Sequence, residues 1–216
     1  MANSDIQILQ FGTGNFLRAF IGSMVQDLNE NGNSLNICII QSTSGKSLEK
    51  LKAQNFEYHL LAAGYKEGQK IETMRKITCV KEGLRLPDEL DRFMDFASSL
   101  QLKWIISNVT EAGMVMKDED PFENFAESFA GRLTQWLHLR FHRNPETETI
   151  ILPCELLPNN GDLLKSFVLE HAKNWRLSPD FILWLGDRVI FFNSLVDRIV
   201  PGFPSHLELK LRDTDP

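Results

Sequence analysis

Two glycines after the first apolar run are the first residues whose type and spacing suit a ligand site. Residues 5–10 read D-I-Q-I-L-Q, and Gly12, Thr13 and Gly14 follow closely. A glycine turn between a strand and a helix lets the backbone approach a pyrophosphate, which the N–H groups and the positive dipole end of the helix then bind. The complete dinucleotide fingerprint has a third glycine, and Leu17 stands in its place. We therefore predict a dinucleotide-binding turn, with a ligand-free turn between strand and helix as the alternative.

A second candidate position is the end of the next apolar run, residues 35–41. NAD-binding domains commonly carry an acid there, which hydrogen-bonds the adenosine ribose. This sequence has Gln41 and Ser42 instead, and its next acid is Glu49. Either polar side chain is able to hydrogen-bond the ribose 2′-hydroxyl, and Lys46 is able to reach a 2′-phosphate. NAD and NADP therefore both stay open, and an S-adenosylmethionine site, which also uses an acid here, is disfavoured.

These positions need strands that end at one edge of a sheet. Apolar runs alternate with stretches of helical periodicity, which indicates parallel strands joined by right-handed crossovers. Runs 56–63 and 70–80, separated by a turn at 66–68, predict an inserted antiparallel hairpin. The fold class is therefore α/β, a Rossmann-like, doubly wound and mostly parallel sheet with this hairpin inserted. The other expected strands are 5–10, 35–41, 104–108 and 149–152, and the expected helices are 16–28, 47–54, 87–100, 121–140 and 162–174.

The composition narrows the class of protein. The 216 residues are 43% hydrophobic and 24% charged, which is typical of a globular domain. We expect this domain at residues 1–200, and residues 201–216 as a tail or the start of another domain. The net charge of −6 disfavours binding to nucleic acid or an anionic membrane. The sequence shows no membrane-length apolar run and no signal peptide, and its three cysteines are scattered. We therefore expect a cytoplasmic protein without a disulfide framework or a zinc site.

Four ordered blocks of this sequence resemble one known family. Residues 12–19 read G-T-G-N-F-L-R-A, similar to the opening G-x-G-x-F-x-R-A of the polyol-specific long-chain dehydrogenases, the mannitol dehydrogenase family. The blocks S-N-V-T-E-A-G at 107–113, C-E-L-L-P-N-N-G at 154–161 and N-S-L-V-D-R-I at 193–199 agree with it in order and spacing. The likeness covers nearly the whole chain. Within the family, the first two blocks look most like the tagaturonate reductases, also called altronate oxidoreductases.

The resemblance implies an NAD-linked interconversion of a secondary alcohol and a ketone on an open-chain sugar acid or polyol. It also implies an N-terminal Rossmann domain that binds the cofactor and a helical C-terminal domain that supplies most of the catalytic groups. The residues that we expect at the cofactor are Gly12, Thr13, Gly14, Asn15, Phe16, Leu17, Arg18, Gln41, Ser42 and Asn108.

The same resemblance gives supporting roles to residues of the three later blocks. It associates Glu111 with a proton path, although a helix cap or a solvated acid is the alternative. It favours Asn160 as a hydrogen-bond donor to the substrate oxygen that gains negative charge. The alternative is that Asn160 only shapes the turn. Asn159, Asn193 and Arg198 become candidate substrate contacts, with a structural pair of Asp197 and Arg198 as the alternative.

The catalytic signature of the family, K-x4-N-x2-H, does not occur in this sequence. Lys50 and Asn55 have the right spacing, but Tyr58 occupies the histidine place and His59 misses it by one residue, so we interpret the match as coincidence. We therefore expect the C-terminal helical domain to be absent and the chain alone to be inactive. The alternatives are a catalytically inert dinucleotide-binding module and an interaction domain with an empty nucleotide groove.

Two further features concern metals and self-association. His138 and His142 lie four residues apart, but the glutamate of the H-E-x-x-H zinc motif is missing, so we interpret them as a solvated helix end and predict no metal site.

A face that would meet a second domain should be apolar, and such a face should promote self-association. Its candidate residues are Phe191, Phe192, Ile199, Val200 and Phe203.

Overall fold

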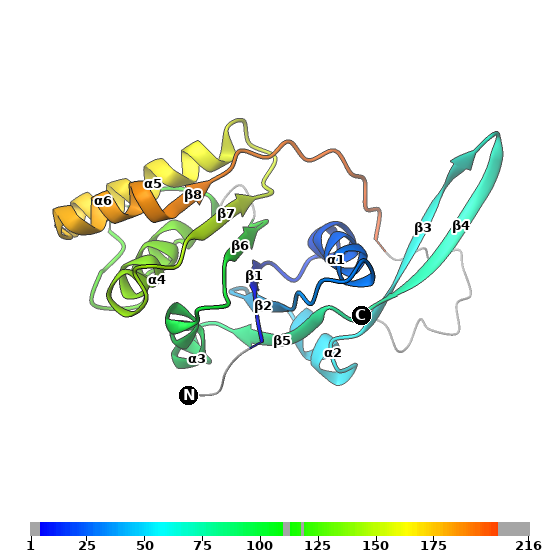
Figure 1. Ribbon diagram of the computed structural model, residues 1–216, viewed down its shortest axis with the longest axis horizontal. Coiled ribbons are helices and arrows are strands. Elements are labelled where there is room, and N and C mark those ends of the chain that lie inside the picture. Colours follow the sequence, from blue (N-terminus) through cyan, green and yellow to red (C-terminus); the bar gives the residue numbers. More distant parts are fainter. Residues whose placement is uncertain (1–4, 110–112, 118, 203–216) are drawn as a thin grey trace.

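The computed structural model describes residues 5–109, 113–117 and 119–202. They form a six-stranded sheet with helices on both faces and a separate two-stranded hairpin (Figure 1). No helix in the described part of the chain is long and apolar enough to cross a membrane.

The six-stranded sheet is parallel throughout. Its spatial order is β5-β2-β1-β6-β7-β8. Counted among these strands alone, this is the order 3-2-1-4-5-6 of dinucleotide-binding Rossmann sheets, so the predicted fold class is confirmed. The strands are β1 (Ile8–Phe11), β2 (Ile37–Gln41), β5 (Val80–Arg85), β6 (Trp104–Ser107), β7 (Thr149–Pro153) and β8 (Val189–Phe191).

The helices cover the sheet with two separate hydrophobic cores. Alternate side chains of β1 enter different cores: Leu9 and Phe11 pack on the face that carries α3 to α6, and Ile8 packs on the face that carries α1 and α2. Every residue of β1 and β2 is buried, which explains why both strands read as continuous apolar runs. The helices are α1 (Asn15–Glu30), α2 (Ser47–Ala53), α3 (Leu90–Asp95), α4 (Phe129–Arg143), α5 (Asn160–Asn174) and α6 (Pro179–Arg188), with a short 3-10 helix at Phe96–Ser98.

The predicted hairpin forms and stands away from the sheet (Figure 1). Its strands β3 (Tyr58–Lys66) and β4 (Gln69–Ile77) pair in antiparallel register around Glu67 and Gly68, which both have positive φ. Two such residues between paired strands are typical of a tight hairpin turn. Tyr58 anchors the base, because its hydroxyl donates to the Arg18 carbonyl oxygen at 2.8 Å.

Five elements differ from the sequence prediction. The helix predicted over 87–100 is shorter, with α3 at Leu90–Asp95 and the 3-10 helix at Phe96–Ser98. The hairpin strand predicted over 70–80 ends at Ile77, and Val80 begins the separate strand β5. The sequence predicts neither β8 nor α6. The helix predicted from residue 121 begins at Phe129 instead. Its start is fixed by two caps: the Ser128 hydroxyl accepts from Gly131 N at 2.9 Å, and the Asp120 carboxylate accepts from Glu127 N at 2.8 Å. These caps satisfy free N–H groups of α4 and of the segment before it, so the helix starts there rather than at Pro121.

Candidate dinucleotide site at the carboxyl edge of the sheet

The predicted glycine turn lies at the carboxyl end of β1, between β2 and β6. This is the point where the strand order reverses, and Rossmann sheets bind their ligand there. Gly12 has φ +124°, and a Cβ at this position would lie 3.1 Å from the Asn108 carbonyl oxygen. Its N–H donates to the Ile40 carbonyl oxygen at 3.1 Å. Gly12 is therefore required by the conformation and by the close approach of the end of β6.

The N-terminus of α1 is open to solvent at its first residues. Gly14 caps the helix with φ −66° and ψ 159°, and a Cβ there would meet no atom within 4 Å. Gly14 and Asn15 are exposed, and Gly12 and Thr13 are partly exposed. The first N–H groups of a helix have no partner within the helix, so this end of α1 presents donors to an anion.

The remaining residues of the opening block face the protein interior. Leu17, at the third glycine position, is buried in the core beneath α1. Phe16 packs against Phe20, with ring centroids 5.5 Å apart. The buried guanidinium of Arg18 donates to the Asn15 side-chain oxygen and lies 5.6 Å from the centroid of the Tyr58 ring. Arg18 therefore holds Asn15 at the turn, whereas direct contacts of Phe16, Leu17 and Arg18 with a cofactor remain predictions.

At the end of β2, Gln41 shapes the loop that follows it. The amide nitrogen of its buried side chain donates to the Thr43 carbonyl oxygen at 2.7 Å, and its side-chain oxygen accepts from Leu48 N at 3.1 Å. Arg85 donates to the same Thr43 carbonyl oxygen at 3.3 Å, from the end of the neighbouring strand. Ser42 is exposed at this edge. Ser42 is therefore the better placed of the two residues to meet a ribose.

Asn108 joins the ends of three strands. Its N–H donates to the Phe11 carbonyl oxygen at 3.0 Å, and its side-chain amide donates to the Cys154 carbonyl oxygen at 2.7 Å. The structure thus brings Gly12 and Asn108 together at the carboxyl edge of the sheet, and a ligand shared by them stays a prediction. Glu111 lies outside the described residues.

Asn160 is completely buried and holds the segment after β8 against the end of β7. Its amide nitrogen lies 2.9 Å from the Glu155 carbonyl oxygen and 3.0 Å from the Ser194 hydroxyl, and its side-chain oxygen accepts from Ser194 N at 2.9 Å. The structure therefore gives Asn160 a structural function, and the predicted donation to substrate stays a prediction. Its neighbour Asn159 is exposed and has a left-handed backbone conformation, with φ +52°.

Residues 192–202 run from β8 across to α1 (Figure 1). Asn193 caps α5, because its side-chain oxygen accepts from Asp162 N at 3.0 Å and its amide donates to the Asp162 carboxylate at 2.8 Å. Arg198 donates to the Ala19 carbonyl oxygen at 2.8 Å, and its guanidinium lies 5.2 Å from the centroid of the Phe20 ring. Both side chains thus fasten this segment to the domain, and their predicted substrate contacts remain untested.

A buried carboxyl group at this edge was missed by the sequence analysis. Glu155 follows β7, and its Oε1 accepts from Val109 N at 2.9 Å. Burial raises the pKa of the Glu155 carboxyl, while the hydrogen bond from Val109 opposes that shift. An acid directly after an apolar strand was the available signal. Glu155 and Asn108 together fix the loop that leaves β6.

The comparison with known proteins agrees with this geometry. The sequence profile described as the Rossmann domain of mannitol dehydrogenase matches residues 6–215. The chain belongs to the mannitol dehydrogenase family.

Relatives within the family carry a more specific name. This chain is 37% identical over 203 residues to an altronate oxidoreductase of Bacillus subtilis (strain 168), which covers 92% of this chain and 42% of the relative. It is 35% identical over 213 residues to an altronate oxidoreductase of Escherichia coli O1:K1 / APEC, covering 96% of this chain and 44% of the relative. The chain therefore spans less than half the length of these relatives.

A solved structure shows the same fold. The ternary complex of Pseudomonas fluorescens mannitol 2-dehydrogenase with NAD and D-mannitol superposes with a TM-score of 0.81 at 21% sequence identity. The match covers 98% of this chain and 46% of that protein. The predicted family is confirmed, and the fold is that of a mannitol dehydrogenase Rossmann domain.

The charge of Glu155 is expected to lower the stability of this domain at neutral pH. Because burial raises its pKa in the folded state, the destabilisation is present above the folded pKa and disappears as the pH falls toward the ordinary value of 4.5. Glu155→Gln keeps an acceptor for Val109 N and removes the charge. Urea unfolding at about pH 7 should show a gain in stability that shrinks at about pH 5.

The matched control is Glu148→Gln, which neutralises an exposed carboxyl. It should leave the free energy of unfolding nearly unchanged at both pH values. Equal effects of the two substitutions would show that the charge of Glu155 is not disfavoured in the folded protein.

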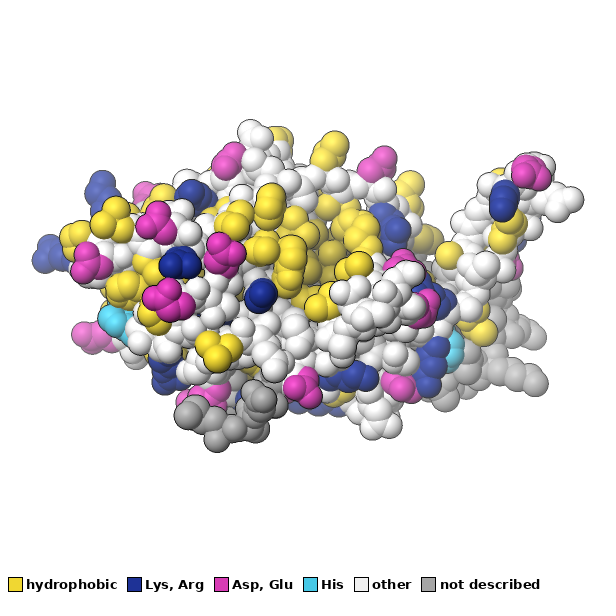
Figure 2. Space-filling model, viewed as in Figure 1, with side chains coloured by type: hydrophobic (Ala, Val, Ile, Leu, Met, Phe, Trp, Pro, Cys, Tyr) yellow, Lys and Arg dark blue, Asp and Glu magenta, His cyan; other side chains and the backbone are white. Residues whose placement is uncertain are grey.

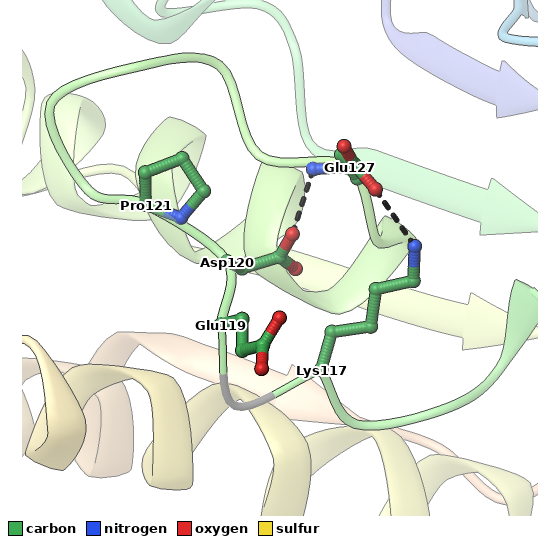
Figure 3. Close-up of a pocket in the computed structure, with 5 residues that line it drawn as sticks. All are labelled: Lys117, Glu119, Asp120, Pro121 and Glu127. Carbon is green, nitrogen blue, oxygen red and sulfur yellow. Dashed lines mark hydrogen bonds and ion pairs between the residues drawn. The ribbon is translucent and has the colours of Figure 1, made fainter.

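A separate recess of about 440 Å³ lies beside the start of α4. In Figure 3 the Asp120 carboxylate points to the Glu127 N–H, and Lys117 reaches the Glu127 carboxylate, at 2.9 Å. None of the residues of the glycine turn lines this recess. The lining residues are Lys117, Glu119, Asp120, Pro121 and Glu127.

A serine, a histidine and the Asp120 of this recess lie close together without forming a catalytic triad. Nε2 of the buried His171 lies 3.4 Å from the Ser128 hydroxyl and 3.8 Å from the Asp120 carboxylate. In a triad the serine and the acid contact opposite ring nitrogens, so that the proton of the serine passes to a histidine that the acid orients. Here both face the same nitrogen, and Ser128 and Asp120 cap α4. The cluster therefore anchors the segment before α4.

Proposed function

We propose that this chain binds NAD across the carboxyl edge of its sheet, as the cofactor domain of an oxidoreductase. The observation that carries the proposal is the position of Gly12, Thr13 and Gly14: they follow β1 at the point where the strand order reverses and open onto the N-terminus of α1. The open space at Gly14 fits the close approach of a pyrophosphate. The NAD complex of the structurally similar mannitol 2-dehydrogenase also supports it.

In this proposal the residues of the chain bind and orient the dinucleotide. The backbone of residues 12–15 holds the pyrophosphate, Ser42 meets the ribose on the loop that Gln41 shapes, and Asn108 lies beside the nicotinamide. Bound NAD supplies the hydride chemistry. The β2–α2 loop carries Lys46 and no acid before Glu49, so NADP is the second candidate cofactor.

The proposed substrate pair is altronate and tagaturonate, or a related sugar acid or polyol, because relatives at 34–37% identity are altronate oxidoreductases. Supporting contacts would come from Glu111, Asn159, Asn160, Asn193 and Arg198. The K-x4-N-x2-H signature does not occur in the sequence. We therefore propose that the chain binds cofactor but needs a catalytic lysine from outside these residues, and that residues 1–200 form the cofactor domain of a cytoplasmic protein.

Self-association is part of the proposal. Leu195 and Ile199 are 98% and 90% exposed on the segment that crosses to α1, and Phe192 is about half exposed. Figure 2 shows hydrophobic side chains gathered over the middle of one face of the molecule. Such a face favours contact with another protein surface. Of the other predicted residues, Phe191 and Val200 are partly buried, and Phe203 lies outside the described residues.

Titration with NADH, followed by nicotinamide fluorescence, tests the function. We expect saturable binding at one site per chain, with NAD competing for it. Reduction of tagaturonate, followed by NADH absorbance, should show negligible turnover by the chain alone. Absence of dinucleotide binding would favour the alternative, an interaction domain with an empty groove, and robust turnover would overturn the need for an outside lysine.

A further inference from the structure

Two histidines on α4 turn the same ring nitrogen toward each other. His138 and His142 are four residues apart, and their Nε2 atoms lie 3.2 Å from one another. The sequence analysis assigned them to a solvated helix end. Instead, the His138 ring is half-buried and packs edge-on against Phe122 and Phe181, with centroids 5.3 and 5.1 Å away. These contacts hold one imidazole of the pair in place.

The distance between the two nitrogens suits a shared metal ion. Zinc binds imidazole nitrogen at about 2.0–2.1 Å, so two imidazoles on one tetrahedral ion have nitrogens about 3.3 Å apart. The observed separation of 3.2 Å matches this value.

The place of the pair on α4 also favours a cation. His142 lies in the last turn of the helix, where the helix dipole is negative. Two arginines of the same turn have other partners. Arg140 donates to the carbonyl oxygens of Ser99 and Leu102, and Arg143 lies 3.8 Å from the Asp95 carboxylate.

We propose that His138 and His142 form a two-ligand site for a late first-row divalent cation, with Zn²⁺ as the representative ion. Imidazole is a preferred ligand of these ions. Within the described residues, no group of three or more histidine, cysteine or acidic side chains could hold a metal ion. Water therefore completes the coordination, and the site is open and exchangeable. Without the ion, the two Nε2 atoms lie within hydrogen-bond distance of each other.

Calorimetric titration of the chain, without an affinity tag, with zinc chloride tests the proposal. We expect one equivalent of Zn²⁺ to bind. Because the second imidazole binds at a high effective concentration, His142→Ala should weaken binding about 100-fold. His142 is exposed, so this substitution leaves the core intact. Circular dichroism checks the fold, and His138→Gln should give the same loss.

The matched control is His59→Ala, which removes an imidazole from the hairpin, away from α4. It should bind Zn²⁺ as the unaltered chain does. Two results would overturn the proposal: no saturable binding by the unaltered chain up to about 1 mM Zn²⁺, or affinities of the His142→Ala and His138→Gln variants within about threefold of it. If His142→Ala failed to fold, His142→Gln would give the same comparison.

Discussion

Replacing Gly161 with alanine is expected to destabilise the domain by about 3 kcal/mol, at the upper end of the usual range for an overpacked site. A Cβ on Gly161 would lie 2.3 Å from the carbonyl oxygen of Phe192 and 2.9 Å from Asn193 N. Both are backbone atoms, so no side-chain rotation relieves the collision. The segment after β8 would have to leave α5, which would break the hydrogen bonds between Asn160 and Ser194.

Urea unfolding followed by tryptophan fluorescence measures this loss, and Gly186→Ala is the matched control. Gly186 is exposed in α6, and a Cβ there meets nothing within 4 Å. Alanine favours a helix over glycine by up to about 1 kcal/mol, so this variant should be slightly more stable than the unaltered protein. A Gly161→Ala variant as stable as the Gly186→Ala variant would show that the Phe192 backbone does not pack on α5.

The central strands could be predicted because the sequence around them carries one consistent signal. Residues 37–41 are buried on both faces of a parallel sheet, and such a strand reads as an unbroken apolar run. Strand β5 is at the edge of the sheet and mixes Lys81 and Glu82 with apolar residues, so it resembled a continuation of the hairpin. Its Gly83 also reads as a strand breaker, yet a Cβ there would collide with Leu48 and Phe56. Only the packed structure shows why that glycine belongs in a strand.

The candidate site was predictable in its backbone and much less in its side chains. The glycine turn follows from a local pattern, strand, glycines and helix, which any Rossmann domain needs at this place. The partners of the polar side chains come from distant parts of the sequence. Asn160 binds Ser194, 34 residues later, and Arg198 binds the backbone of Ala19, 179 residues earlier. Asn160 and Arg198, both predicted to contact a substrate, thus hold the segment after β8 to the domain. Asn160 is buried, and a buried polar group needs a hydrogen-bond partner. Both pairings join residues far apart in the sequence, so no local pattern predicts them.

Replacing Gly14 with alanine is expected to weaken NAD binding at least about tenfold, which corresponds to 1.4 kcal/mol. The expected loss comes from contact of the added Cβ with the ligand, and the protein itself accepts the alanine. The backbone at Gly14, with φ −66° and ψ 159°, suits alanine, and no protein atom lies within 4 Å of the added Cβ. That space is where the pyrophosphate would approach the helix N-terminus. The cost to stability should stay below about 1 kcal/mol, since only the capping residue of α1 changes.

The NADH titration measures this effect, and Gly64→Ala is its control. Gly64 lies in β3 of the protruding hairpin, and a Cβ there also meets nothing within 4 Å. This variant should bind NADH like the unaltered chain. Equal affinity of the Gly14→Ala variant would place the dinucleotide away from the turn after β1. A selective loss with preserved stability would instead assign the open end of α1 to the ligand, because packing gives no other reason for a glycine there.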